Sequence, residues 1–178
     1  MSTARKKTPQ KIYLGKYIVP AILLTVCTLS VLSWYWGREK RDEILIRSLI
    51  GELAEDLSKT PQESTAQSLL KVKNIADAFN SPADIVMDKY AAGSFDSEQL
   101  FNHATRYRTM LQTASVSVDN INITVIDENN ASGYFSGSFS GTTKNGLSDR
   151  IVKDIEVDLI KVNNKWKIKS LKFSNVLR

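Results

Sequence analysis

The chain has 178 residues, of which 24 are Lys or Arg and 19 are Asp or Glu, giving a formal net charge of +5. The basic residues before position 17 have no acid among them, and they are Arg5, Lys6, Lys7, Lys11 and Lys16. The rest of the chain is therefore formally neutral, which argues against nucleic-acid binding because that function needs a basic face on the folded domain. One His and one Cys are too few for a disulfide framework or a structural zinc site.

Residues 17–37 form an uncharged, mostly apolar run, YIVPAILLTVCTLSVLSWYWG. About 20 helical residues cross the ~30 Å hydrocarbon core of a bilayer, so the run predicts a single transmembrane helix. Aromatic residues at its two ends are expected to lie at the headgroup level as anchors. They are Tyr17, Trp34, Tyr35 and Trp36.

Other interpretations of this run fit less well. A cleaved signal peptide needs a small-residue cleavage site, but the run ends in Ser33-Trp34-Tyr35-Trp36. A lipoprotein signal would use Cys27, but the preceding Val26 is large and the apolar sequence continues past the cysteine. A buried core helix rarely runs this far without a charged residue. We therefore expect a basic tail at 1–16, a transmembrane helix at 17–37 and a folded region after it.

The charges that flank the run indicate its orientation. Five Lys and Arg residues precede it, and Arg38, Lys40, Arg41 and Arg47 follow it among acids. The positive-inside rule then favours a cytoplasmic N-terminus, with the basic tail on the anionic cytoplasmic leaflet. The expected location is the inner (plasma) membrane, with the large C-terminal domain outside the cytoplasm.

Helices are expected in the first half of the folded region. Residues 38–59 read as a juxtamembrane helix that packs against the domain or forms a short coiled coil, since Ile46, Ile50 and Leu53 share a face. A second helix is expected to start at a capping box made by Thr60 and Glu63. A short helix is expected at 83–90, and another at 96–113, capped by Asp96.

Strands are expected in the second half, where apolar residues alternate over 115–126, 131–143, 151–162 and 165–173. A change of phase near Asp119-Asn120, and another before Leu171, indicate β-bulges. Asn145-Gly146 and Asn163-Asn164 are expected to turn the chain. A row of lysines on the last strand indicates a solvated face, or an edge protected from pairing.

This order predicts an α+β fold, with helices packed on a curved antiparallel sheet of about four strands. The strands at 115–126, 131–143 and 151–162, and the closing Asn163-Asn164-Lys165-Trp166-Lys167-Ile168, resemble the nuclear-transport-factor-2-like (cystatin-like) superfamily over residues 60–178. With an N-terminal membrane helix, the layout is similar to the bitopic assembly subunit of type IV secretion systems and to mammalian-cell-entry-associated membrane proteins. Both resemblances imply an extracytoplasmic accessory role.

The same resemblance implies a cone that opens at one end, where some family members bind ligands or act as isomerases or dehydratases with an Asp or His base. Residues able to contribute at the mouth are Asp88, Tyr90 and His103, although each also reads as an ordinary helix-end or surface residue. The expected cavity wall is formed by Phe135, Phe139, Ile155 and Trp166. The sequence shows no catalytic, cofactor-binding or metal-binding motif, so none is predicted.

Two functions remain after this reading. The first is a non-enzymatic, membrane-anchored scaffold or accessory protein of an envelope complex for secretion or transport. Its partners would be the lipid bilayer and membrane or envelope proteins, with homo-oligomerisation left open and no nucleic acid. The second is a ligand-binding or isomerase-like cone domain tethered to the membrane.

Overall fold

The computed structural model describes residues 37–87 and 91–175. The chain divides into two compact units, Met1–Lys40 and Arg41–Arg178, and within the first unit the described residues 37–40 are helical. The basic tail and the membrane run up to residue 36, including its aromatic anchors, lie outside the described residues. Within 37–87 and 91–175, no helix has both the length and the apolar character needed to cross a membrane.

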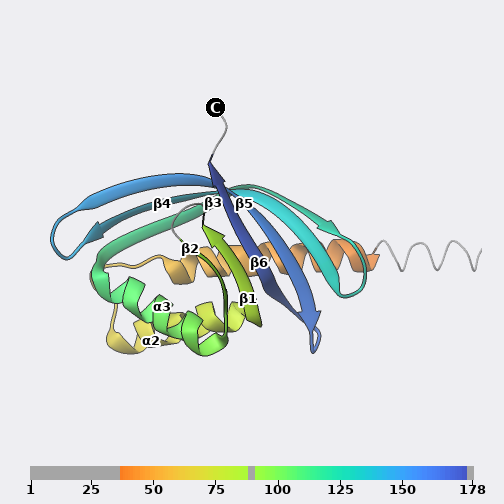
Figure 1. Ribbon diagram of the computed structural model, residues 1–178, viewed down its shortest axis with the longest axis horizontal. Coiled ribbons are helices and arrows are strands. Elements are labelled where there is room, and N and C mark those ends of the chain that lie inside the picture. Colours follow the sequence, from red (N-terminus) through yellow and green to blue (C-terminus); the bar gives the residue numbers. More distant parts are fainter. Residues whose placement is uncertain (1–36, 88–90, 176–178) are drawn as a thin grey trace, which may run out of the picture. The chain divides into compact units, whose positions relative to one another are not determined.

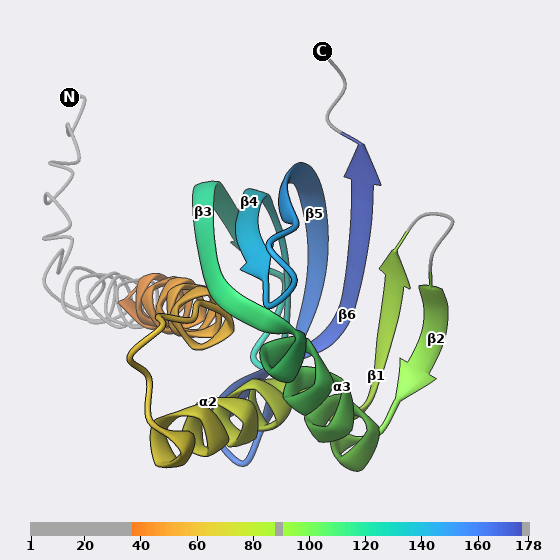
Figure 2. The same ribbon diagram turned by 90° about the vertical axis from the view of Figure 1, so that its left-hand side faces the viewer.

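The second unit starts with residues 41–57 of a helix, called here the leading helix. The elements that follow are α2 (Thr65–Ala78), β1 (Phe79–Met87), β2 (Ala91–Phe95), α3 (Ser97–Met110), β3 (Leu111–Val125), β4 (Asn130–Thr143), β5 (Ser148–Val162) and β6 (Lys165–Asn175). The described strands form one sheet in the order β2-β1-β6-β5-β4-β3 (Figures 1 and 2). Neighbouring strands are antiparallel except β1 and β6, which are parallel.

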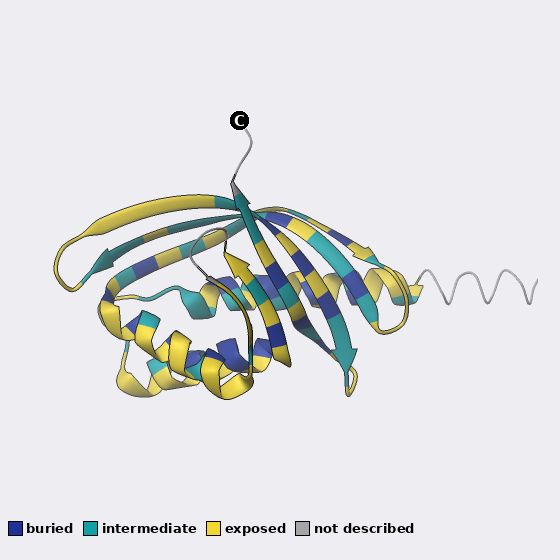
Figure 3. Ribbon diagram, viewed as in Figure 1, coloured by how far each residue is buried: buried dark blue, intermediate teal, exposed yellow. Residues whose placement is uncertain are grey.

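The sheet is curved, and its concave face covers the leading helix, α2 and α3 (Figure 1). Apolar side chains of the leading helix and of the concave face form the core, and Ile46, Ile50, Leu159 and Ile168 are almost wholly buried. Figure 3 shows buried positions alternating with exposed ones along the strands, as expected when one face of a sheet is covered. The prediction that the juxtamembrane helix packs against the domain is confirmed for residues 41–57.

The α+β prediction is confirmed, and both predicted bulges are present. The pairing of β3 with β4 shifts between Asp119 and Asn122, and the pairing of β5 with β6 shifts between Asp158 and Leu159. Because of each shift, the apolar side chains before the bulge and those after it lie on the same face of the sheet, toward the core. Asn163 and Asn164 have φ angles of 51° and 61°, the left-handed conformation that a tight hairpin turn requires.

The prediction of a helix at 83–90 is wrong, because residues 79–87 form β1. This strand pairs with β2 on one side and with β6 on the other, so the described sheet has six strands rather than about four. The segment has no strong helical periodicity, and pairing with a strand much later in the chain decides its conformation. Since β6 lies between β1 and β5, its lysines do not protect a sheet edge, which corrects that interpretation.

Helix starts were predicted with mixed success. Asp96 caps α3 in a capping box with Gln99, as expected. The cap of α2 is Ser64 with Gln67, and the prediction of Thr60 with Glu63 is wrong. The carboxylate of Glu63 has a different partner, the guanidinium of Arg108 on α3.

Arg108 is 1% exposed and makes the largest polar cluster of the described core. Its guanidinium donates to the Glu63 carboxylate, to the backbone carbonyls of Asp56 and Ser58, and to Ser68 Oγ. These bonds join α3 to the end of the leading helix, to α2 and to the segment between them. We call Arg108, Glu63 and their bonds the arginine cluster.

Asp42, which is 5% exposed, makes a second buried polar contact. Its Oδ1 accepts a hydrogen bond from Lys161 Nζ at 2.6 Å and another from Trp166 Nε1 at 3.1 Å. The Lys161 ammonium also lies 4.7 Å from the centre of the Trp166 ring, within cation–π range. This group, called here the Asp42 latch, ties the start of the leading helix to the β5–β6 hairpin.

Candidate functional site

An apolar cavity of about 530 Å³ lies between the leading helix and the concave face of the sheet. The leading helix contributes Ile50, Leu53, Ala54 and Leu57, which share one face because their spacing follows the helical turn. The strands and α3 contribute Met87, Tyr107, Val116, Val118, Phe135, Gly137, Ser138, Phe139, Ile151, Lys153, Ile155, Ile168, Leu171 and Phe173. The volume falls in the ordinary range for small-molecule sites.

Gly137 leaves room for a neighbouring side chain in this wall. It lies between Phe135 and Phe139 on the concave face of β4, and a Cβ atom at this position would come 2.8 Å from Cδ1 of Ile155. Ile155 therefore packs into the space that a side chain at position 137 would need. Such a close approach of a neighbouring side chain is what a glycine inside a strand permits.

The cavity reaches the surface where apolar side chains remain exposed. Met87 at the end of β1 and Ile151 near the start of β5 line it, and each is 42% exposed. Half-exposed apolar side chains at the rim offer an apolar molecule a surface to contact as it approaches. We call this region the mouth of the cavity.

Tyr107 supplies a polar group to the wall. Burial raises the pKa of its phenol to about 12, although the nearby charge of Arg108 acts in the opposite direction. The phenol therefore stays protonated at neutral pH and can donate a hydrogen bond. Its ring lies 6.1 Å from that of Phe139, which places it beside the aromatic part of the wall.

Lys153 supplies the charge among the described lining residues. Lys153 is two residues from Ile151 and two from Ile155 on β5, so all three share the concave face. Its pairing partner on β4 is Gly137. A lysine in an apolar wall buries its methylene chain and directs its ammonium toward the nearest polar surroundings. The half-buried position of Lys153 fits this behaviour.

The structure brings together some of the residues predicted for the cavity. Phe135, Phe139 and Ile155 line it, whereas Trp166 does not and instead bonds Asp42. His103 is exposed on α3, stacked edge-on against Phe95 at 5.4 Å, and it is not among the lining residues. Asp88 and Tyr90 lie outside the described residues.

Sequence reasoning missed Tyr107 and Lys153 as members of the site, yet both left a signal. Tyr107 falls on the same helical face as Leu100 and Ala104, so its hydroxyl had to lie at the edge of the core. Lys153 stands in the apolar phase of β5, where a charge is unexpected. A polar residue at an inward position is more informative than an exposed apolar one.

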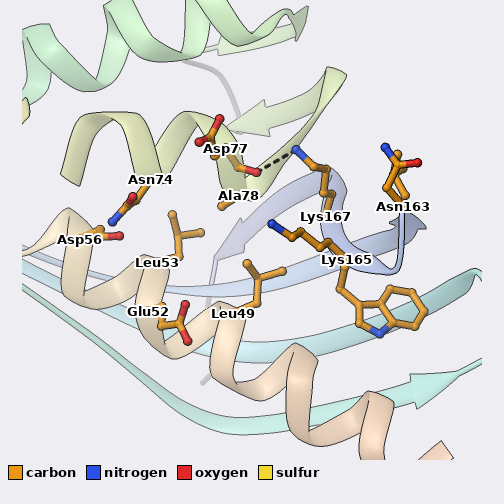
Figure 4. Close-up of a pocket in the computed structure, with 12 residues that line it drawn as sticks. Leu49, Glu52, Leu53, Asp56, Asn74, Asp77, Ala78, Asn163, Lys165 and Lys167 are labelled. Carbon is orange, nitrogen blue, oxygen red and sulfur yellow. Dashed lines mark hydrogen bonds between the residues drawn. The ribbon is translucent and has the colours of Figure 1, made fainter. Parts of the chain in front are cut away.

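A second hollow, of about 600 Å³, lies between the leading helix, α2 and the β5–β6 turn, and we call it the polar groove (Figure 4). Glu52, Asp56 and Asp77 approach it from the helices, and Lys165 and Lys167 approach from β6. Lys167 Nζ donates to the carbonyl oxygen of Asp77 at 3.0 Å.

The charges of the polar groove largely offset one another, which makes it a weaker ligand site than the cavity. Burial raises the pKa of Asp56, partly opposed by a hydrogen bond from Asn74 and by the charges of Lys71 and Arg108. Across residues 37–87 and 91–175, no three His, Cys, Asp or Glu side chains lie close enough together to hold a metal ion. The apolar cavity is therefore the stronger candidate site.

No protein-family model and no curated protein sequence matches this chain. Solved structures do. A candidate scytalone dehydratase from Novosphingobium aromaticivorans has a TM-score of 0.67 and 11% identity, covering 79% of this chain and 88% of its own. A hexachlorocyclohexane dehydrochlorinase has a TM-score of 0.65 and 11% identity, covering 79% and 88%.

A candidate dehydratase of the nuclear-transport-factor-2-like family from Streptomyces avermitilis has a TM-score of 0.62 and 8% identity, covering 79% of this chain and 99% of its own. At these identities the likeness shows the fold alone. The domain therefore has the nuclear-transport-factor-2-like fold, as its strand pattern predicted. The further resemblance to secretion and lipid-transport subunits depends on the membrane run, so it stays a prediction.

Proposed function

We propose that this chain is a membrane-anchored protein whose extracytoplasmic domain binds an apolar small molecule in the cavity beneath its sheet. The observation that carries the proposal is the wall itself, in which apolar side chains from the leading helix and five strands surround about 530 Å³. Burial of apolar ligand surface against such a wall is favourable, at roughly 25 cal/mol per Å². The anchor rests on the uncharged run at 17–37.

For this cavity we propose ligand binding rather than enzymatic catalysis. The fold is compatible with enzymes, because solved structures with this fold include proteins named as dehydratases and a dehydrochlorinase. The described wall offers an ammonium and a phenol, which can hold a polar end of a ligand. Proton abstraction in this fold would call on a carboxylate or imidazole, and neither is among the described lining residues.

Filling the cavity should remove the ligand. Ala54 lies on the leading helix with its side chain in the wall, so Ala54→Phe places a ring in the space that the ligand occupies. Full-length protein is purified from its native membranes in mild detergent, and its small molecules are extracted and identified by mass spectrometry. We expect the wild type to retain one class of apolar compound, and Ala54→Phe to retain about tenfold less.

Glu55→Phe is the matched control, because the adjacent Glu55 is exposed and adds the same ring outside the cavity. It should retain the compound at the wild-type level. If Ala54→Phe unfolds the domain, Leu57→Trp narrows the same cavity from a half-buried position. Equal retention by the wild type and by folded cavity-filling variants would contradict the proposal.

A scaffold function is the second candidate, favoured by two exposed apolar side chains on the leading helix. Ile44 and Leu45 are 66% and 49% exposed, and they follow the predicted membrane run closely. Replacing both with Glu should remove any stoichiometric membrane or envelope protein that co-purifies with the full chain, whereas Arg47→Glu nearby should not. Identical co-purifying proteins in wild type and the double variant would rule out this surface as the contact.

A further inference from the structure

The charges of the polar groove are sorted by side (Figure 4). Its charged residues from the helices are all acids, namely Glu52, Asp56 and Asp77, and those from β6 are the lysines Lys165 and Lys167. In the part of the chain that the structure describes, none of these carboxylates comes within about 4 Å of either lysine ammonium, the separation of an ion pair. Opposite charges therefore face each other across a hollow of about 600 Å³ without pairing.

The acidic side of the groove carries more negative charge than its neighbours offset. Burial raises the pKa of Asp56 above its ordinary value of 3.8, and it outweighs the hydrogen bond from Asn74 and the charges of Lys71 and Arg108. Glu52 adds a second negative charge four residues before Asp56, on the same side of the leading helix, and this charge raises the pKa of Asp56 further. A cation bound between these two carboxylates would relieve their repulsion.

The basic side of the groove is fixed to the end of α2. Lys167 Nζ donates to the backbone oxygen of Asp77 at 3.0 Å and to that of Phe79 at 3.5 Å. The side chain of Lys165 extends over the groove from β6 (Figure 4). An ammonium has three donors and makes its strongest hydrogen bonds to anionic oxygens. The lysines therefore suit the negative end of a ligand.

Apolar side chains complete the lining of the groove. They come from the leading helix, from the end of α2 and from the end of β5, and they are Leu49, Leu53, Ala78 and Val162. A small ligand can bury a short apolar group against them while its charged ends meet the two sides. The volume of the groove lies in the ordinary range for small-molecule sites.

We propose that the polar groove binds a small zwitterion, whose ammonium lies between Glu52 and Asp56 while its anionic oxygens meet Lys165. The shared chemistry is a primary ammonium a few bonds from an anionic oxygen group, supplied either by a free α-amino acid or by the phosphoethanolamine headgroup of a phospholipid. Both ends of such a ligand gain charge-assisted hydrogen bonds, whereas a ligand with one charge gains them on one side only. The groove is a second site beside the apolar cavity, so this proposal goes beyond the binding function above.

The test measures ligand binding to the full chain in phosphatidylcholine nanodiscs by ligand-observed NMR titration. Leucine carries both charges, leucinamide carries the ammonium alone and N-acetylleucine carries the carboxylate alone. We expect leucine to bind about tenfold more tightly than either of the other two. Glycerophosphoethanolamine is titrated beside leucine. Tighter binding of glycerophosphoethanolamine would indicate a lipid headgroup as the ligand, and the reverse order a free amino acid.

Two variants assign each end of the ligand to its side of the groove. Lys165→Gln should weaken leucine binding about fivefold and leave leucinamide binding unchanged, because leucinamide has no anionic group. Asp56→Asn should weaken the binding of both compounds about fivefold. It should not lower the stability of the unliganded domain, because burial disfavours the charged form of Asp56. If Asp56→Asn is poorly folded, Glu52→Gln removes a charge from the same side at an exposed position.

Lys169→Gln is the matched control for Lys165→Gln, because Lys169 is an exposed lysine of the same strand that does not line the groove. It should leave leucine binding unchanged, and so should Ala54→Phe, which fills the apolar cavity.

Three results would overturn the proposal. They are equal binding of leucine, leucinamide and N-acetylleucine, no detectable binding of leucine or glycerophosphoethanolamine, and an equal effect of Lys165→Gln and Lys169→Gln. The apolar cavity has its own test, the retention of an apolar compound, so failure at the groove would leave the proposed binding function in place.

Discussion

Arg108→Ala is expected to lower the free energy of unfolding by about 3–5 kcal/mol, because it leaves the buried Glu63 carboxylate without its main partner. The Glu63 side chain is 5% exposed and that of Arg108 is 2% exposed, so water can replace little of the lost bonding. In the same variant the carbonyl of Asp56 loses the Arg108 donor, and the carbonyl of Ser58 keeps only its hydrogen bond from Lys71 Nζ. Denaturant unfolding of the full chain, followed by a spectroscopic signal of the domain, measures the change.

Arg106→Ala is the control for the arginine cluster, since Arg106 is exposed on the same helix, and it should change stability by less than about 0.5 kcal/mol. The double variant Arg108→Met with Glu63→Gln should recover a large part of the loss, because neither residue then leaves a buried charge. A loss no greater than that of Arg106→Ala would show that the cluster does not stabilise the domain.

The arginine cluster also sets a pH dependence. Burial alone would raise the pKa of Glu63, but the hydrogen bond and charge of Arg108, with the charge of Lys71, lower it below its ordinary value of 4.5. The stabilisation is therefore complete above that value and is lost as pH falls through the lower folded-state pKa. Glu63→Gln should flatten this acid loss in the same unfolding experiment.

Asp42→Ala is expected to cost about 2–4 kcal/mol, because it removes the acceptor for both the Trp166 indole and the Lys161 ammonium. The side chain of Lys161 is 13% exposed, so its charge would be left largely without solvent. Asp42→Asn keeps an acceptor for the indole and loses the charge, so it should fall between Ala and wild type. Thermal and denaturant unfolding of the full chain give the comparison.

Glu43 provides the control for the Asp42 latch, because the next residue of the same helix makes an exposed ion pair with Arg47 at 2.8 Å. Glu43→Ala should cost no more than about 0.5 kcal/mol. If the Asp42 and Glu43 variants lose the same small amount, the latch contributes no more than a surface ion pair and does not hold the leading helix to the hairpin.

Local signals predicted most of the fold. Alternating apolar residues identified β3 to β6, and their two phase changes identified the bulges near Asp119 and before Leu171. Asp96 was recognisable as a helix cap because its side chain and Gln99 are three residues apart. In each case the evidence lies within one element, where sequence spacing and spatial spacing agree.

The remainder depends on contacts between distant segments. β1 forms because Ile85 and Met87 pair with Leu171 and Phe173 of β6. No pattern within residues 79–87 predicts this pairing. Arg108 follows Leu100 and Ala104 at four-residue steps and so faces inward, but its partner Glu63 was read as a helix cap. The cavity was expected from the family resemblance. The position of Lys153 in the cavity wall became clear only from its pairing with Gly137.

The interior position of β6 has a consequence for biosynthesis. β1 and β2 are made early, yet they reach the rest of the sheet only through β6, the last of the described strands. During synthesis, β1 and β2, and then the antiparallel strands β3 to β5, are made before β6. The two groups of strands can pair into one sheet only after β6 has been made. Such long-range closure slows folding and favours chaperone protection of the nascent chain, so loss of a few residues from β6 should split the domain rather than trim it.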